Sequence, residues 1–294
     1  MSRLAHLILG LLLCATPALA QATDYKAMSF SDVKAAADAG NADAQYDLGC
    51  RYYYVAASKN DKKAREAFTK AAAQGQHDAE YELATMVENG EGGAQDSAQA
   101  FALYLKAATG GVSRADADVG LMYLTGDGTP KDIAQAVKWL QAGADAGEPR
   151  AEALMGSLYR DGTGVEADAP KAITLLKASV KQRFAPAATF LEEMYRDGDG
   201  VAKDPIVSHA WRTIAAYLND RGSIEVPKGA TQQYYILMTP NLSQADNMKA
   251  WELYKSLMLE FGFATDDGPS PDGKTADDAA GQFMQAAGKK AGQN

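Results

Sequence analysis

Few side chains in this sequence stand in a pattern that could do chemistry, and the first is a serine–lysine pair. Ser31 and Lys34 fit the spacing Ser-x-x-Lys, in which the lysine assists a serine nucleophile that attacks β-lactams. The Ser-Asp-Asn element that accompanies this motif is missing, and Lys274-Thr275-Ala276 only approximates its Lys-Thr-Gly element. Ser31 also suits the N-cap of a helix, so we expect no catalytic residue here.

Residues for binding cofactors or metals are equally sparse. Glycine pairs recur between expected helices, whereas a dinucleotide-binding glycine loop joins a strand to a helix. The stretch Asp197–Gly200 lacks the frame and the final glutamate of a calcium loop. His77 and His209 stand far apart without a cysteine beside them, which argues against zinc and against a serine–histidine–aspartate triad. The sequence therefore predicts no cofactor, no metal and no catalytic site.

The elements that carry these side chains follow an internal repeat. An alanine opens it five times, with steps of 35, 36, 36 and 36 residues: Ala44, Ala79, Ala115, Ala151 and Ala187. An apolar residue follows four positions later and usually a tyrosine eight positions later, which places all three on one buried helix face. A small residue five positions after most of these alanines lets a neighbouring helix approach closely. Self-similarity at this period is typical of stacked helical repeats.

A turn and a second helix complete each repeat. Glycines 11 and 13 positions after the alanine end the first helix in all but the first repeat, because glycine adopts a left-handed backbone at little cost. An aspartate 17 positions after the alanine is expected to cap the second helix: Asp61, Asp96, Asp132, Asp168 and Asp204. The second helix ends at a glycine four residues before the next alanine. Arg183 replaces that glycine once, which predicts a less regular junction.

Three of these repeats resemble the Sel-one-like repeat (SLR) family, as Ala-Glu-Ala-Leu-Met-Gly-Ser-Leu-Tyr-Arg-Asp-Gly-Thr-Gly-Val in the fourth repeat illustrates. They are Ala115–Asp132, Ala151–Ala172 and Ala187–Asp204. The resemblance spans roughly residues 30–220, and the repeat that opens at Ala44 departs from it most. It implies an all-α fold, a right-handed α-solenoid of about five antiparallel helix pairs with capping helices at both ends. It also implies an adaptor, regulator or scaffold.

The two ends of the chain are expected to differ from the repeats. Residues 1–20 resemble a secretory signal peptide, with Arg3 before an apolar stretch and cleavage after Ala20. The remaining expected parts are an N-terminal capping helix within 21–43, five repeats over 44–220, a loop and C-terminal capping helix over 221–262, and a disordered tail over 263–294. The apolar face of the C-terminal helix is expected to contain Met248, Trp251, Leu253, Tyr254, Leu257 and Met258.

Charge and cysteine content narrow the class of partner. The chain has 29 basic and 38 acidic residues, a net charge of −9, and loss of Arg3 with the signal peptide takes it to −10. This balance argues against nucleic acid and anionic membranes and suits a basic patch on a partner. Cys50 would be the only cysteine of the mature chain, either buried or a free thiol, and could form no intramolecular disulfide. We expect a periplasmic or secreted protein without an integral membrane segment, and favour a monomer.

A protein partner is expected on the first helices of the repeats. By analogy with tetratricopeptide repeats, positions two, six, nine and ten residues after the alanine face a concave groove. The partner-binding residues that this predicts are Tyr46, Cys50, Tyr53, Tyr54, Tyr81, Glu88, Leu121, Leu124, Arg160 and Arg196. Exposed tyrosines are favoured anchors. The alternative is that the N-terminal capping helix packs over them.

Three functions are compatible with the sequence. The favoured one is a periplasmic adaptor or regulator that holds an envelope sensor or an export component in its groove. An immunity protein that sequesters a secreted toxin, such as a phospholipase, would use the same surface. A β-lactam-hydrolysing or penicillin-binding enzyme is the third, and it rests on Ser31 and Lys34.

Overall fold

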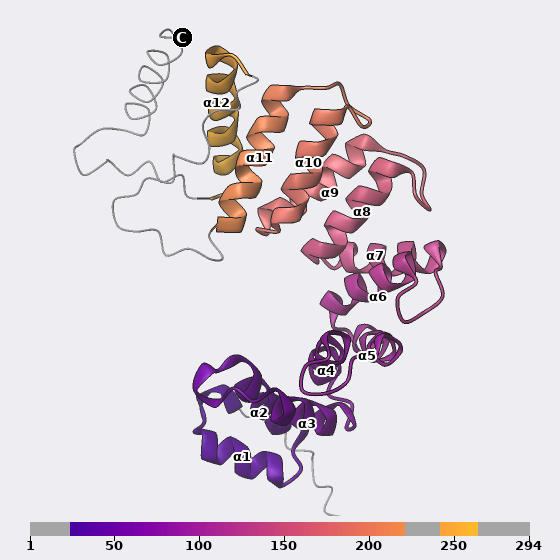
Figure 1. Ribbon diagram of the computed structural model, residues 1–294, viewed down its shortest axis with the longest axis vertical. Coiled ribbons are helices and arrows are strands. Elements are labelled where there is room, and N and C mark those ends of the chain that lie inside the picture. The colour runs from indigo at the N-terminus through magenta and orange to yellow at the C-terminus, as the bar shows by residue number, and fades with distance from the viewer. Residues whose placement is uncertain (1–23, 221–241, 264–294) are drawn as a thin grey trace, which may run out of the picture. The chain divides into compact units, whose positions relative to one another are not determined.

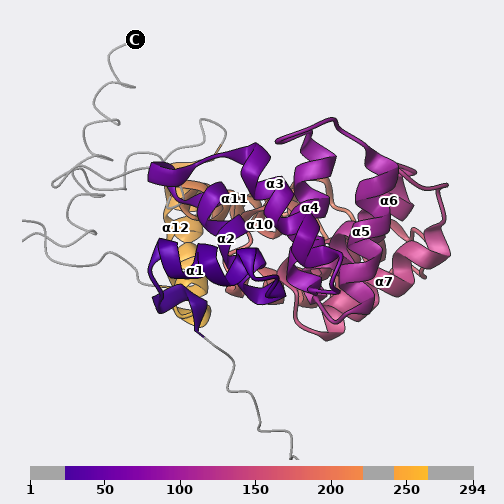
Figure 2. The ribbon, with the colours of Figure 1, turned by 90° about the horizontal axis from the view of Figure 1, so that it is seen from below.

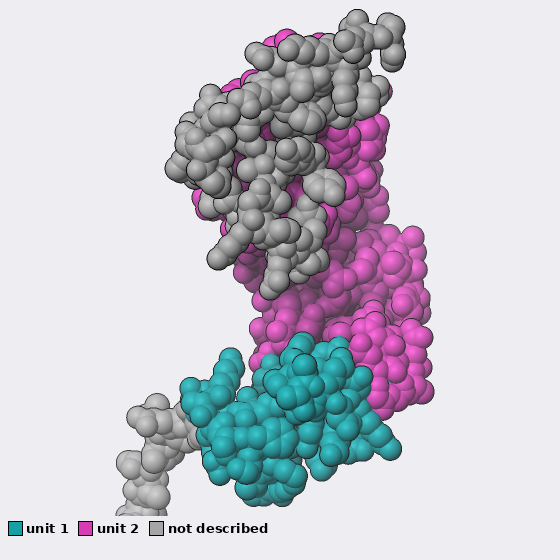
Figure 3. Space-filling view, turned by 60° about the vertical axis from the view of Figure 1, so that its left-hand side comes forward, with its two compact units in different colours: residues 1–76 teal, residues 77–294 magenta. Residues whose placement is uncertain are grey.

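The computed structural model describes residues 24–220 and 242–263 (Figure 1). Within these ranges all regular structure is helical: twelve α-helices and two short 3-10 helices. The chain divides into two compact units, unit 1 up to Gln76 and unit 2 from His77 (Figure 3). The expected signal peptide, nearly all of the expected loop and all but the first residue of the expected tail lie outside the described residues.

Unit 1 contains the expected N-terminal capping helix and the first repeat. Its helices are α1 (Phe30–Asp38), α2 (Ala42–Tyr54) and α3 (Asp61–Ala72), with 3-10 helices at Tyr25–Ala27 and Ala56–Ser58. Both α1 and α3 pack against α2 (Figure 2). Val33 of α1 is buried in one cluster with Ala44 and Leu48 of α2. In this way α1 covers apolar surface of the first repeat that no preceding repeat is there to cover.

Unit 2 contains four helix pairs and one further helix in the residues described. The pairs are α4 (His77–Asn89) with α5 (Ser97–Thr109), α6 (Ser113–Thr125) with α7 (Ile133–Asp145), α8 (Pro149–Asp161) with α9 (Ala169–Lys181), and α10 (Ala185–Asp197) with α11 (Pro205–Asp220). Each second helix also packs on the first helix of the next pair, and α12 (Gln244–Glu260) packs on α11 (Figures 1 and 2). Helix pairs that pack in chain order form an α-solenoid, which confirms the predicted fold class.

The predicted apolar stripe is buried at two of its three positions. The five alanines that open the repeats are 0% exposed, and the residues four positions later are at most 7% exposed. At the third position only Val87 is buried, whereas the tyrosines are half-buried: Tyr52, Tyr123, Tyr159 and Tyr195. A tyrosine at the edge of the core buries its ring and keeps its hydroxyl near water.

Glycine within the first helices permits close packing. A Cβ atom on Gly120 would lie 2.5 Å from Cγ of Leu140, and one on Gly156 would lie 2.8 Å from Cγ of Leu176. No carbon atom fits at such distances, so the second helix of each of these repeats approaches its first helix only because the side chain is missing.

Helix capping follows the predicted aspartates with one exception. Asp96, Asp132 and Asp168 each accept a hydrogen bond from the backbone N–H three residues later. The prediction for Asp61 is wrong, because Asn60 caps α3 and Asp61 is its first residue. The first repeat is one residue shorter than the others, and the 3-10 helix at Ala56–Ser58 replaces its glycine turn. The cap therefore falls one position earlier.

The junction at Arg183 keeps the backbone geometry of its glycine counterparts. Gly75, Gly111 and Gly147 have φ angles of 79°, 94° and 74°, and Arg183 has a φ of 68°. It is the only residue other than glycine with a positive φ in the part of the chain that the structure describes. Its guanidinium lies 4.7 Å from the ring centroid of Phe263, a contact that glycine could not make.

The C-terminal end differs from the sequence prediction at two residues. Phe263, expected to begin the tail, is only 4% exposed, because Gly262 has a φ of 68° and turns the chain back over α12. The N–H of Phe263 donates to the carbonyl of Met258 at 2.9 Å, the bond of a Schellman motif. Met248, expected on the buried face, is 38% exposed because it lies outside the arc that Trp251 and Met258 share.

Candidate protein-interaction surface

The first helices of the second to fifth repeats, α4, α6, α8 and α10, supply one surface of unit 2, which we call the first-helix face. Direct contacts join α6 to α8 and α8 to α10. In the tetratricopeptide arrangement these are the helices that meet a partner. The site is therefore described from the side chains that these helices leave partly exposed, together with the buried groups that hold them in place.

Two arginines link consecutive first helices. Nη2 of Arg114, at the start of α6, lies 2.9 Å from Oδ1 of Asp78 and 3.4 Å from Oε1 of Glu82, both on α4. Arg150, at the start of α8, pairs in the same way with Asp118 of α6. The side chains of Glu82 and Asp118 are each only 8% exposed. Each of these junctions thus contains an ion pair between a buried acid and a partly exposed arginine.

Two tyrosines pack beside these ion pairs. The rings of Tyr81 on α4 and Tyr104 on α5 meet edge to face with centroids 5.5 Å apart, and the Arg114 guanidinium lies 4.2 Å from the Tyr81 centroid. The Tyr104 hydroxyl donates to Oε2 of Glu88 at 2.8 Å and lies 3.1 Å from Oγ1 of Thr85. Burial raises the pKa of both tyrosines, so their hydroxyls remain protonated and can donate.

Asp118 is a buried acid of this region whose pKa is raised. Burial raises its pKa to about 6, while the charge and hydrogen bond of Arg150 and the neighbouring Tyr81 hydroxyl act in the opposite direction. The negative charge of Glu88 adds to the increase. Oδ1 is taken by Arg150, whereas Oδ2 is buried and has no hydrogen-bond partner among the described residues. We call Tyr81, Glu88, Tyr104 and Asp118 the acidic–aromatic cluster.

The remaining predicted residues of unit 2 lie on the same first-helix face. Leu121 and Leu124 are half-buried on α6. Arg160 of α8 is half-buried, and its Nη1 donates to Glu193 of α10 at 3.2 Å. Arg196 of α10 is exposed and pairs within its own helix. The structure thus brings Tyr81 and Glu88 into one cluster and leaves the two arginines in separate ion pairs.

The analogy with tetratricopeptide repeats holds for only some positions. Ala117 and Ala153, two residues after the repeat alanines and expected to face the groove, are buried with 0% exposure. Asp118, which the sequence did not single out, carries a buried oxygen of the face that has no hydrogen bond of good geometry within the described ranges. The sequence does contain a signal for this pairing. Arg114 and Arg150 each directly precede a repeat alanine, and an acid lies three positions after the alanine of the previous repeat.

The predicted residues of unit 1 lie on α2. The rings of Tyr53 and Tyr54 meet edge to face with centroids 4.7 Å apart, and Tyr54 is 63% exposed. Tyr46 and Cys50 are half-buried. The capping helix α1 contacts another tyrosine of α2, because Phe30 lies 5.6 Å from Tyr52 between ring centroids.

The serine–lysine pair is not arranged for catalysis. Ser29, and not Ser31 as the sequence suggested, caps α1 by accepting a hydrogen bond from the backbone of Asp32. Nζ of Lys34 lies 2.5 Å from Asp38, and this hydrogen bond raises the lysine pKa. A lysine that acts as a base needs a lowered pKa and contact with the serine, so this environment opposes the role.

Histidines and acids elsewhere have ordinary partners. Nδ1 of His77 lies 2.8 Å from Glu80, and Nδ1 of His209 lies 2.8 Å from Arg212. In the described part of the chain no three histidine, cysteine or acidic side chains come together as metal ligands would. A separate finding is that none of the described helices has the length and apolar character needed to cross a membrane.

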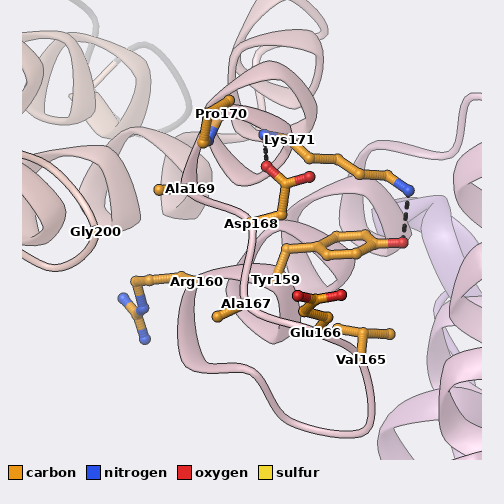
Figure 4. A pocket seen from close by; sticks show the side chains of 10 residues that line it. All are labelled: Tyr159, Arg160, Val165, Glu166, Ala167, Asp168, Ala169, Pro170, Lys171 and Gly200. Atoms are coloured by element: carbon orange, nitrogen blue, oxygen red, sulfur yellow. Dashed lines mark hydrogen bonds between the residues drawn. The ribbon is translucent and has the colours of Figure 1, made fainter.

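An open hollow of about 830 Å³ lies at the turn of the fourth repeat (Figure 4). The Lys171 side chain crosses the Tyr159 ring, with Nζ 2.6 Å from its hydroxyl, and the Lys171 backbone donates to Asp168. Arg160 extends away from Lys171 (Figure 4), and Gly200 of the next turn completes the lining. The hollow lies between two successive glycine turns. Its basic groups, Arg160 and Lys171, already have partners, so we prefer the first-helix face as the candidate site.

Comparison with known proteins gives the family of the chain. The Sel1 repeat matches five segments: 42–76, 77–112, 113–148, 149–183 and 187–220. A search of the curated proteins finds no match. A Sel1 repeat protein from Oxalobacter formigenes is 32% identical, with a TM-score of 0.58 over 63% of this chain and 75% of that one.

Two further solved structures are similar. The protective antigen c5321 of uropathogenic Escherichia coli, which has an SLR fold, is 30% identical with a TM-score of 0.58, over 79% of this chain and 56% of that one. The immunity protein Pa5087 from Pseudomonas aeruginosa is 18% identical with a TM-score of 0.46, over 78% and 89%, too distant to bear on function. Because the five matched segments cover more than half of its residues, the chain belongs to the Sel1 repeat family.

Proposed function

We propose that this protein is an exported adaptor or regulator that binds a partner protein on the first-helix face. Sel1 repeats mediate protein–protein interactions, so a protein partner is the general function of the family. The observation that carries the proposal is the acidic–aromatic cluster, in which Tyr81 and Glu88 of the first helix α4 are partly exposed. Buried Tyr104 of α5 holds them in place through a hydrogen bond to Glu88 and a ring contact with Tyr81.

The cluster is well suited to binding because its side chains are already held in place. Tyr104 is fixed by hydrogen bonds to Glu88 and Thr85, and Tyr81 is packed between Tyr104 and Arg114. Aromatic and arginine side chains that lose little freedom on binding supply much of the energy at protein interfaces. Half-buried Leu121 and Leu124 add apolar surface on the adjoining helix α6.

The proposed location is the periplasm or the exterior of the cell. It rests on the sequence of residues 1–20, whose basic start, apolar stretch and small-residue end have the pattern of a cleaved signal. N-terminal sequencing of protein recovered from an envelope fraction tests it. We expect the mature chain to begin at Gln21, whereas recovery from the cytoplasm with an intact N-terminus would contradict export.

The binding surface is tested by capture from an envelope extract. Tagged protein is compared with the double variant Leu121→Glu, Leu124→Glu and with Leu259→Glu, a matched control because Leu259 is 67% exposed on α12. We expect the α6 variant to lose the partner and the control to retain it, with equal helical circular dichroism. Leu121→Ser serves as a milder variant if the double one unfolds. Retention by both α6 variants would contradict partner binding on the first-helix face.

The identity of the captured protein separates two roles. A sensor or an export component would support the adaptor or regulator. A secreted toxin held in a very tight one-to-one complex would instead identify an immunity protein that uses the same face. Mass spectrometry of the captured protein, followed by titration calorimetry, distinguishes the two.

A further inference from the structure

Two carboxylates of the acidic–aromatic cluster are brought together from different helices. Glu88 stands at the end of α4, and Asp118 lies in the middle of α6. Two tyrosines connect them: the Tyr104 hydroxyl donates to Glu88, the Tyr104 ring meets the Tyr81 ring, and the Tyr81 hydroxyl lies beside Asp118. The charge of Glu88 adds to the raised pKa of Asp118. Like charges held close together in a partly buried place repel each other, and a cation between them would relieve the repulsion.

Among the described residues, each carboxylate has one oxygen to which no side chain donates with good geometry, and the Tyr81 hydroxyl is the neighbour of the Asp118 carboxylate. Oε2 of Glu88 accepts from Tyr104, and within the described residues no hydrogen bond uses its Oε1. Oδ1 of Asp118 pairs with Arg150, and Oδ2 is buried without a partner in the same ranges. The two oxygens differ in access, since Glu88 is half-buried and the Asp118 side chain is 8% exposed. Glu88 is therefore the outer acceptor and Asp118 the inner one.

The aromatic side of the cluster also suits a cation. The Tyr81 ring has the Arg114 guanidinium 4.2 Å from its centroid, so one face of this ring already makes a cation–π contact. Arg114 itself is paired with Asp78 and Glu82. Arg150 is the only basic group in contact with the two cluster carboxylates in the described part of the chain. Negative charge in the cluster thus exceeds positive charge.

We propose that the acidic–aromatic cluster receives a lysine or arginine side chain from a basic segment of the partner protein. The cation would contact Glu88 first and reach Asp118 as the half-buried Tyr81 side chain moves aside. The net charge of −9 on the whole chain would attract such a segment over a longer range. This inference rests on the proposed function, because it specifies which chemical group of the partner binds the first-helix face.

The test uses a short capped peptide of alternating arginine and alanine as the probe, with the matching glutamine–alanine peptide as its control. Binding to the full mature chain is followed by backbone amide shifts in nuclear magnetic resonance spectra. We expect the arginine peptide to shift amides around Thr85, Glu88 and Leu121, and the glutamine peptide to leave them unchanged. Shifts spread over the acidic surface, with no concentration in α4 and α6, would overturn the proposal.

A charge-neutral variant makes the test specific. Glu88→Gln removes the charge and keeps an oxygen that can accept from Tyr104, so the fold should survive. Glu166→Gln removes the same charge from an exposed residue of the fourth repeat turn and is the matched control. We expect Glu88→Gln to weaken peptide binding by about tenfold, the loss of one charge-assisted hydrogen bond, and Glu166→Gln by much less. Equal weakening in both variants would contradict a defined site.

The same variants separate this inference from the proposed function. If Glu88→Gln captures the natural partner as wild type does, while Leu121→Glu with Leu124→Glu does not, the face binds a partner without a cation in the cluster. If neither change affects capture, the proposed function itself fails. If both weaken capture and Glu166→Gln does not, both proposals stand.

Discussion

Arg114 donates from Nη2 to Oδ1 of Asp78 at 2.9 Å, and the two residues occupy the same position in consecutive repeats. An acid in one repeat thus binds a base in the next. Arg150, one period further on, binds Asp118 in turn. The series ends at the fifth repeat, where Pro186 holds the equivalent position. The next junction, between α8 and α10, instead uses Arg160 and Glu193, which stand at other positions of their repeats.

Removal of Arg150 should destabilise the protein more than its partial exposure suggests. Arg150→Met leaves the Asp118 carboxylate buried without its cation, which costs about 3–5 kcal/mol at fully buried sites. The Arg150 side chain is 36% exposed, so water screens part of this cost, and we expect about 2 kcal/mol. Urea unfolding near pH 7.5 measures it.

The control for Arg150→Met is Lys177→Met, which breaks an exposed pair with Glu260. It should cost under about 1 kcal/mol. A lower pH should narrow the gap between the Arg150 variant and wild type, because protonation of Asp118 removes the buried charge. Equal losses in the two variants at neutral pH would contradict a buried role for the Asp118 pair.

Asp116 should make stability fall as pH rises from about 4 to about 6. Burial and the charge of Glu148 raise its pKa from 3.8 to about 6, so the folded state holds a proton that the unfolded state has lost. Asp116→Asn should therefore stabilise the protein near pH 7.5, by at most about 3 kcal/mol, with a gain that disappears near pH 4. Urea unfolding of both proteins across this range tests the sign. A gain that does not depend on pH would contradict it.

Gly120→Ala should destabilise the third repeat, by about 1–3 kcal/mol. The added Cβ would lie 2.5 Å from Cγ of Leu140, which is fully buried. A double-mutant cycle with Leu140→Ala provides the control. In that background the added methyl group has room, so the cost of Gly120→Ala should shrink. An unchanged cost would mean that the contact between these helices does not limit packing.

The repeat pattern predicts the helices because each position has the same neighbours in every repeat. The alanines and the residues four positions later are buried as the spacing requires, and Asp96, Asp132 and Asp168 cap as expected. A shorter first repeat moves its cap to Asn60, a change that a fixed offset cannot detect.

The candidate site is less predictable from sequence because it joins residues far apart in the chain. Arg150 and Asp118 are separated by 32 positions. They also occupy different positions of their repeats, since Arg150 precedes its repeat alanine by one residue and Asp118 follows its own by three. Asp116 and Asp118 are buried. Because acids are usually exposed, residue type alone would place both on the surface. Phe263 returns to the core through one backbone turn at Gly262, which composition does not reveal.

The protein should not hydrolyse nitrocefin. Lys34 pairs with Asp38, which raises its pKa and holds it in the charged form, so it cannot serve Ser31 as a base. Absorbance measured with purified protein and with Ser31→Ala should be the same as in buffer alone. Turnover by wild type that disappears in Ser31→Ala would contradict this expectation.

A protein partner that binds the first-helix face should protect the backbone of these helices. Hydrogen–deuterium exchange of the protein with and without its captured partner tests it most directly, because exchange reports on each helix separately. We expect slower exchange in peptides from α4 and α6, with little change in α5, α7 and α9. Slower exchange confined to those second helices, with α4 and α6 unchanged, would contradict it.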